Sequence, residues 1–212
     1  MGAMRTPAKQ DWKGVSAAER REQRRSRLLD AAAELLGTEG VTAVTIRATC
    51  RTAKLTERYF YEEFDGRDAL LTATYDRSAV RVIAALREAI PPGITGLRAR
   101  ARAGVSGLLD YFARHPADAR ILVIEAVREP VLTRRGTEAT ILLMSLVTGE
   151  KADPVDEILT GTVLGAGLGV LFAAWLDGQL PVDRERFVEH ATCLIEHAVR
   201  VSSHPEDQTT EA

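Results

Sequence analysis

The chain has 212 residues, 45% of them hydrophobic, which is enough to bury one large core or two smaller ones. Its two cysteines, Cys50 and Cys193, lie far apart without a CxxC pair. This spacing argues against a disulfide framework or a structural metal and favours a reducing cytoplasm. The net charge of -2 hides an asymmetry, because residues 1–64 carry 12 Lys and Arg against 9 Asp and Glu while the remainder is acidic.

The first predicted helix runs from about Arg20 to Leu36, where leucines and alanines recur at helical spacing, and Gly37 and Gly40 are expected to end it. Five arginines lie between residues 20 and 27, with one glutamate among them. Such a cluster is typical of surfaces that neutralise phosphates, although solvated helix ends carry the same pattern.

Two short helices are predicted next. Thr45 is a suitable N-cap for a helix over about residues 46–52, and residues 53–55 are expected to form a turn. Thr56 is expected to cap the following helix in the same way, with Phe60 and Phe64 facing inward one turn apart. Two short capped helices around a three-residue turn predict a helix-turn-helix.

Six further helices are separated by Pro and Gly signals. We expect them at about residues 67–90, 97–114, 116–127, 131–147, 154–177 and 184–201. Asp153 before Pro154 is typical of a helix start, Gly178 of a helix end, and Pro181 with Asp183 of a second start. Strand-like alternation is nearly absent, so the predicted fold class is all-α with about nine helices.

Residues 24–71 resemble the DNA-binding domain of the TetR family of bacterial transcription regulators. The resemblance rests on LLDAAAELLGTEG in the first helix, on Thr45 opening the second, on LTERYFYEEF at residues 55–64 and on GRDALL after it. It implies an N-terminal three-helix DNA-binding domain followed by a C-terminal helical domain for ligand binding and dimerisation. We therefore divide the chain into a disordered extension (1–19), the DNA-binding domain (20–66), the second domain (67–201) and a disordered tail (202–212).

The resemblance also implies which residues contact DNA. Thr56, Glu57, Arg58 and Tyr59 would begin the recognition helix in the major groove, with Arg58 and Tyr59 as readers of bases. Thr45, Tyr61 and Arg67 match positions that grip phosphates, and Arg47 is a further candidate contact. For each residue a solvated surface side chain is the alternative interpretation. Glu62 and Glu63 are expected to point away from phosphates or to accept from a cytosine amine.

The chain departs from the family pattern at Thr49, Cys50 and Lys54, where an aliphatic residue, alanine and glycine are usual. A lysine in a left-handed turn costs about 1 kcal/mol relative to glycine.

An uncharged segment, residues 158–176, reaches the length at which a membrane span must be considered. Its glycines and threonines, its acidic flanks and its soluble neighbours favour a buried helix without a membrane. In the resembled family the last two long helices form a homodimer interface. The residues expected there are Gly161, Gly165, Leu168, Gly169, His190, Cys193 and His197. A two-fold dimer implies a pseudo-palindromic operator in double-stranded DNA.

The family also typically carries a pocket for a small-molecule effector, unidentified here, in its C-terminal helices. Candidate lining residues are Tyr111, Glu125, Met144, Phe172 and Trp175, each of which would otherwise be ordinary core. His190, Cys193 and His197 share one helix face, but packing is favoured over a metal site. We expect no cofactor, and no motif for catalysis is found, which indicates a non-enzyme.

The leading hypothesis is a cytoplasmic, dimeric repressor that a ligand releases from its operator. The alternatives are an activator or partner-binding regulator of the same fold and, remotely, a helical ligand-binding protein without a DNA-binding role.

Overall fold

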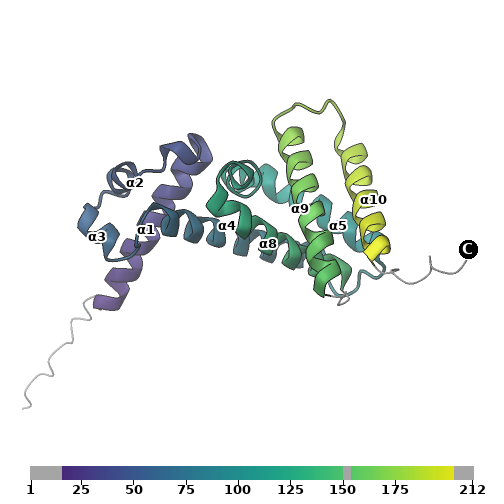
Figure 1. Cartoon of the computed structure of the whole chain (residues 1–212), viewed down its shortest axis with the longest axis horizontal. Helices are drawn as coiled ribbons and strands as arrows, with labels where there is room; N and C mark the ends of the chain where they lie inside the picture. The colour runs from purple at the N-terminus through teal and green to yellow at the C-terminus, as the bar shows by residue number, and fades with distance from the viewer. Residues whose placement is uncertain (1–15, 150–153, 203–212) are drawn as a thin grey trace, which may run out of the picture.

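The computed structural model describes residues 16–149 and 154–202, and none of these residues forms a strand. Three helices form one end of the molecule (Figure 1): α1 (Ala17–Thr38), α2 (Ile46–Ala53) and α3 (Glu57–Tyr61), with the short η1 (Val41–Ala43) between the first two. The middle contains α4 (Arg67–Ala89), α5 (Leu97–Arg114), α6 (Pro116–Ala119), η2 (Arg120–Glu125), α7 (Ala126–Arg128) and α8 (Pro130–Thr148). The long helices α9 (Pro154–Leu176) and α10 (Arg184–Ser202) lie side by side at the other end. The predicted all-α fold class is confirmed.

A capping box starts α1 three residues before the expected position. The Ser16 Oγ accepts from the Glu19 amide at 3.1 Å, and the Glu19 carboxylate accepts from the Ser16 amide. The expected disorder of residues 1–19 is therefore wrong for Ala17 to Glu19, while residues 1–15 lie outside the described residues. Gly37 lies inside α1 instead of ending it, whereas Gly40 turns the chain with φ of 91°.

The later helix boundaries agree closely with the sequence-based expectation. The expected helix over residues 116–127 is one unbroken run of α6, η2 and α7, but its middle is a π-helical segment that no sequence signal indicated. Gly178 has φ of 71°, as expected of a helix end, and the Asp183 carboxylate accepts from the Arg186 amide at 2.8 Å. Asp153 and residues 203–212 lie outside the described residues, and Ser202 still belongs to α10.

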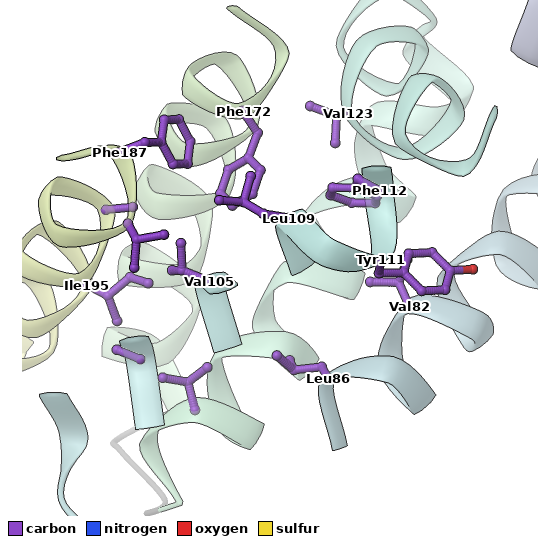
Figure 2. Close-up of a cluster of buried hydrophobic side chains, with 14 of the residues drawn as sticks. Val82, Leu86, Val105, Leu109, Tyr111, Phe112, Val123, Phe172, Phe187 and Ile195 are labelled. Carbon is purple, nitrogen blue, oxygen red and sulfur yellow. The ribbon is translucent and has the colours of Figure 1, made fainter. Parts of the chain in front are cut away.

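The described residues form two apolar cores. The first lies among α1, α2, α3 and the start of α4, and includes fully buried Leu28, Leu36 and Phe60. The second lies among α4, α5, α8, α9 and α10, and Figure 2 shows Phe112, Phe172 and Phe187 within it. Burial of each such side chain contributes about 1.5–3 kcal/mol. Because α4 enters both cores, it links the two halves mechanically.

Helix α9 differs from the other helices because most of its apolar surface is uncovered. Residues Ile158–Leu176 are long and apolar enough to cross a membrane by length and composition alone, and only 17% of that window is buried. Eight exposed, uncharged positions recur at spacings of three and four along one side, which we call the α9 stripe. It consists of Val155, Ile158, Leu159, Thr162, Val163, Ala166, Gly167 and Val170. An apolar surface of this extent is typical of an interaction site.

Candidate functional site

The entry to α2 is fixed by Thr45. Its extended backbone precedes the helix, and its Oγ1 accepts from the Ala48 amide at 3.1 Å, which stabilises the helix start by about 1 kcal/mol. The Thr45 side chain stays exposed, so its hydroxyl hydrogen is available for an outside acceptor. Arg47 is also exposed one turn before Arg51, an exposed cation that the sequence reasoning did not single out.

The turn between α2 and α3 is left-handed at Lys54, with φ of 53°, at the position where the resembled pattern usually has glycine. The Lys54 amide closes the turn by donating to the carbonyls of Arg51 and Cys50. From α1, the Arg27 guanidinium donates to the carbonyls of Ala53 and Lys54 at 2.5 and 3.2 Å. These contacts offset the unfavourable backbone and hold the turn against α1.

Helix α3 buries one side and exposes the other. Phe60 is fully buried and packs against Phe64, with ring centroids 5.7 Å apart. Arg58, Tyr59 and Tyr61 are exposed. Thr56 has an N-cap backbone, but its side chain makes no capping hydrogen bond, which corrects the expectation that it caps α3 as Thr45 caps α2.

The arginine cluster on α1 mostly binds the end of α3 instead of remaining free for phosphates. Arg21 donates to the Glu63 carboxylate at 3.1 Å and to the Glu62 carbonyl at 3.0 Å, and Arg25 donates to the Glu63 carbonyl at 3.1 Å. Arg24 completes the group, with its guanidinium 3.6 Å from the Glu62 carboxylate and stacked 4.8 Å from the centre of the Tyr59 ring. The cluster therefore sets the position of α3.

Glu63 accordingly points inward and Glu62 stays at the surface, where its carboxylate is 3.3 Å from the Arg58 guanidinium. Arg58 itself is 85% exposed, so this ion pair is worth only about 0.3–0.5 kcal/mol. Arg47 and Glu57 form a similar loose pair at 3.9 Å. The exposed Arg47 and Arg58 can therefore exchange their partners at little cost, whereas Arg21 and Arg24 of α1 pair with a carboxylate, Glu63, that is buried.

Arg67, which was expected to contact a phosphate, lies where the α1–α2 connection meets the end of α7, a place that we call the joint. Its guanidinium donates to the carbonyls of Val44 and Val41 at 2.8 and 2.9 Å and to the Glu129 carboxylate at 3.3 Å. Because these hydrogen bonds occupy its guanidinium, we leave Arg67 out of the interface that we propose below.

Glu125, expected in the ligand pocket, lies at the same joint. Its buried carboxylate accepts from the Val41 amide at 2.9 Å and pairs with Arg120 and Arg128 at 3.3 and 3.6 Å. Arg120 also donates to the Thr38 carbonyl at the end of α1. Gly40 packs between the side chains of Arg120 and Glu125. A Cβ on Gly40 would lie 3.2 Å from an atom of each of them. Hydrogen bonds from η2 thus hold the α1–α2 connection in position.

An apolar cavity of about 290 Å³ lies in the second core, lined by residues of α4, α5, η2, α7, α8, α9 and α10. Met144 and Phe172 line it, as the sequence predicted, and Figure 2 shows Phe112 and Phe172 among the surrounding side chains. Tyr111 does not line the cavity. Its hydroxyl points away from it and donates to the Asp118 carboxylate at 2.5 Å. Trp175 packs on Phe187 and donates to the Val182 carbonyl. The expectation that Tyr111 and Trp175 line the pocket is therefore corrected.

The cavity and the joint share one wall. Leu122, Val123 and Ala126 line the cavity, while Arg120 and Glu125 of the same run hold the α1–α2 connection. A π-helical turn is a frequent feature of functional sites, and here it directs neighbouring side chains to both sides.

Two glycines of α9 pack against α8 within the chain. A Cβ on Gly161 would lie 2.8 Å from Ile141 Cγ1, and one on Gly165 would lie 2.7 Å from Thr140 Oγ1, so both allow α9 to approach α8 closely. Leu168 and Gly169 line the cavity, and Gly165 lines it as well. These four expected interface positions thus have neighbours or a cavity within this chain, while the exposed positions of α9 form the α9 stripe, which the sequence analysis did not single out.

On α10, His190 and His197 are exposed with Leu194 between them, and the His197 Nδ1 lies 2.8 Å from the Cys193 carbonyl. Cys193 is half-buried, with its Sγ 3.6 Å from Arg98 of α5. Within the described part of the chain no three His, Cys, Asp or Glu side chains are grouped to hold a metal ion.

Comparison with known proteins places this architecture among bacterial regulators. Residues 28–74 match the model of the tetR family of bacterial regulatory proteins. The chain is 28% identical over 178 residues to the HTH-type transcriptional activator FasR of Mycolicibacterium smegmatis, which covers 80% of each protein. It also resembles the crystal structures of a TetR-family transcriptional regulator from Streptomyces coelicolor (TM-score 0.63, 22% identity, 84% and 99% covered) and one from Marinobacter aquaeolei VT8 (TM-score 0.58, 21% identity, 85% and 97% covered).

Proposed function

Because the chain belongs to the TetR family of DNA-binding transcription regulators, we propose that it binds an operator through the exposed face of α2 and α3. The observation that carries this proposal is the exposure of Arg58, Tyr59 and Tyr61 on a short helix whose opposite side is anchored by Phe60. A helix held in this way presents its first residues rigidly to a major groove.

Arg58 and Tyr59 are the proposed readers of bases, with Thr56 and Glu57 beside them at the start of α3. Arg58 exchanges its exposed pair with Glu62 for the O6 and N7 of a guanine. Arg24 stacks on the Tyr59 ring and so limits its orientation. Each fixed rotamer lowers the entropy lost on binding.

Thr45, Arg47 and Tyr61 are the proposed phosphate contacts. They are exposed on the α2 and α3 face, and hydroxyl and guanidinium donors suit phosphate oxygens. Such contacts set the register on DNA without reading its sequence.

We propose further that the protein acts in the cytoplasm as a homodimer joined through the α9 stripe and the exposed His190, Leu194 and His197 of α10. A second copy of this chain covers the stripe with an equally apolar surface, as a two-fold interface requires. Two recognition helices would then meet successive major grooves of a pseudo-palindromic site.

We propose that a ligand acts by binding in the cavity. Residues of η2 line this cavity, and Glu125 of η2 also bonds the Val41 amide in the α1–α2 connection. A ligand that prefers one arrangement of this joint shifts the spacing of the two DNA-binding ends. Repression released by the ligand is the first form of this proposal. Activation is the second, and the name of the M. smegmatis relative favours it.

The test is binding of the purified protein to the DNA upstream of its own gene, followed by fluorescence anisotropy. Arg58→Ala should weaken specific binding by about 10- to 100-fold, which corresponds to roughly 1–3 kcal/mol for a bidentate contact to a guanine. The matched control is Arg134→Ala on α8, because Arg134 is 87% exposed and also pairs with a glutamate four residues later.

The control variant removes the same charge far from α3, so its affinity should equal that of the wild type at each salt concentration. Equal affinity of wild type and Arg58→Ala would refute the proposed reading face. Transcription in vitro from the same DNA then separates repression from activation.

A further inference from the structure

The cavity has an uncharged lining. Its wall consists mainly of aliphatic and aromatic side chains, including Val82, Leu86, Val105, Phe112 and Phe172 (Figure 2). None of the described residues that line it is charged. Its volume of about 290 Å³ is at the lower end of the range of ligand pockets.

Five lining side chains carry hydroxyl groups, and four of these hydroxyls already donate a hydrogen bond within the protein. Each of these four donates to a backbone carbonyl of its own neighbourhood: Thr133 to Ala126, Thr137 to Thr133, Thr140 to Gly136, and Thr162 to Ile158. A threonine bonded in this way offers its methyl group, and only a lone pair of its oxygen, to a ligand. The fifth is Tyr75 on α4.

Tyr75 is buried, with 3% of its surface exposed, and its hydroxyl has no hydrogen-bond partner among the described residues. The hydroxyl lies beside Gly136, another lining residue, since a Cβ there would be 3.7 Å from the Tyr75 oxygen. Burial, together with the nearby charge of Asp76, raises the pKa of Tyr75 to about 12, so the group keeps its proton at neutral pH. The hydroxyl oxygen itself is not fully buried and reaches the open space of the cavity, where an acceptor on a bound molecule can meet it.

We propose that the cavity binds a slender, uncharged, mostly aliphatic ligand with one hydrogen-bond acceptor, such as a ketone, an ester or a lactone, and that Tyr75 donates to that acceptor. This inference rests on the proposed function only in treating the cavity as the effector site. A free carboxylate is excluded as the buried group because no lining cation compensates for its desolvation.

Removal of the hydroxyl distinguishes this role from packing. Tyr75→Phe keeps the ring and should unfold at about the same temperature as the ligand-free wild type, because the substitution removes no hydrogen bond to a described residue. The matched control is Tyr111→Phe, since Tyr111 is an equally buried tyrosine whose hydroxyl is bonded to Asp118 outside the cavity. That control should unfold at a lower temperature.

Ligand class is tested by displacement of the uncharged fluorophore N-phenyl-1-naphthylamine with octan-2-one, octane and octanoate at neutral pH. Octan-2-one should bind about fivefold more weakly to Tyr75→Phe than to the wild type, as expected for one net hydrogen bond, while octane is unaffected. Octanoate should bind at least about tenfold more weakly than the ketone. Tyr111→Phe should leave all three affinities unchanged.

An equal loss of octan-2-one and octane binding in Tyr75→Phe would overturn the donor role, and so would octanoate binding more tightly than the ketone. Absence of displacement by all three compounds would overturn the ligand class. Operator binding is measured on the same samples, so protein that binds DNA but none of these probes refutes this inference alone, whereas protein that binds the ketone but no DNA refutes the proposed function.

Discussion

The α3 end and the α9 end of the molecule expose opposite kinds of surface. At the α3 end Arg47, Arg58 and Tyr61 are exposed, and ion pairs from Arg21 and Arg24 of α1 to the buried Glu63 carboxylate hold the helix in position. At the α9 end the exposed surface is an uncharged stripe, and the interior contains a cavity. Charged side chains remain soluble without a partner and exchange water for phosphate, whereas an apolar stripe is stable in water only when it is covered. The first surface suits reversible binding to DNA, and the second suits a permanent partner.

The largest expected effect is at the α9 stripe. Val163→Glu, at a residue that is 72% exposed, would place two like charges near each other across a two-fold interface and bury them from water. We expect the dimer to dissociate at least about 100-fold more readily, as measured by analytical ultracentrifugation, and cooperative binding to both half-sites to be lost with it.

The control is Val80→Glu on α4, because Val80 is likewise an exposed valine, 65% accessible, but lies outside the stripe. Its dimer should match that of the wild type. If both variants remain dimeric, the interface lies elsewhere and the contrast between the two ends loses its functional meaning.

The next effect is at the joint that connects the ends. Glu125→Gln keeps the size of the side chain but removes the charge shared by Arg120 and Arg128, which should destabilise the protein by about 3 kcal/mol. Urea unfolding measures this loss, and hydrogen exchange should show the Val41 amide to be less protected.

Glu138→Gln provides the comparison, since Glu138 pairs with Arg134 and Arg135 at an exposed site on α8. It should change stability by less than about 1 kcal/mol. Unchanged exchange at Val41 in Glu125→Gln would mean that η2 does not hold the α1–α2 connection.

A smaller, pH-dependent effect is expected at Asp118 on α6, next to the joint. Burial alone raises the pKa of Asp118, but hydrogen bonds from Arg81, Tyr111 and Ser78 outweigh it and hold the pKa below the ordinary value of 3.8. A lowered pKa in the folded state contributes stability that is present above pH 3.8 and lost as the pH falls through the folded-state value.

Asp118→Asn should therefore be about 2 kcal/mol less stable than the wild type at neutral pH, with the gap narrowing toward about pH 3. Urea unfolding at both pH values checks this. A gap that stays constant would show that packing, and not the charge of Asp118, is what the substitution removes.

The α3 end was largely predictable from the sequence because its determinants are local. Thr45, Phe60 and Lys54 act within a few residues of their own positions, so caps, apolar spacing and turn geometry identified them. The roles of Arg67 and Glu125 were not predictable, because each depends on a partner 23 to 84 residues away that only the fold brings near.

The α9 end was harder to predict for a related reason. The GxxxG spacing of Gly161 and Gly165 indicates a close helix neighbour without saying whether that neighbour is α8 or a second copy. Likewise, apolar residues such as Met144 and Trp175 have the same pattern whether they surround a cavity or fill a core. The missing information is the rotation of each helix about its axis, which depends on packing.

The smallest expected effect contrasts buried threonines at the two ends. Thr49 of α2 occupies a position where the TetR pattern has an aliphatic residue, and it is fully buried with no hydrogen-bond partner for its Oγ1. Thr192 of α10 is equally buried, but its Oγ1 donates to the Val188 carbonyl at 2.7 Å. Valine has nearly the same shape as threonine without the hydroxyl.

Thr49→Val should therefore stabilise the protein by about 1 kcal/mol, because an unsatisfied polar group is removed, whereas Thr192→Val should destabilise it by a similar amount. Thermal unfolding of both variants and the wild type measures the two signs. If both substitutions destabilise, the Thr49 hydroxyl has a partner in solution, and the α3 end is less tightly packed behind α2 than its core indicates. Opposite signs would instead show that the Thr49 hydroxyl is an unsatisfied polar group, which α2 accommodates while Arg27 at the turn and Thr45 at the cap hold the helix.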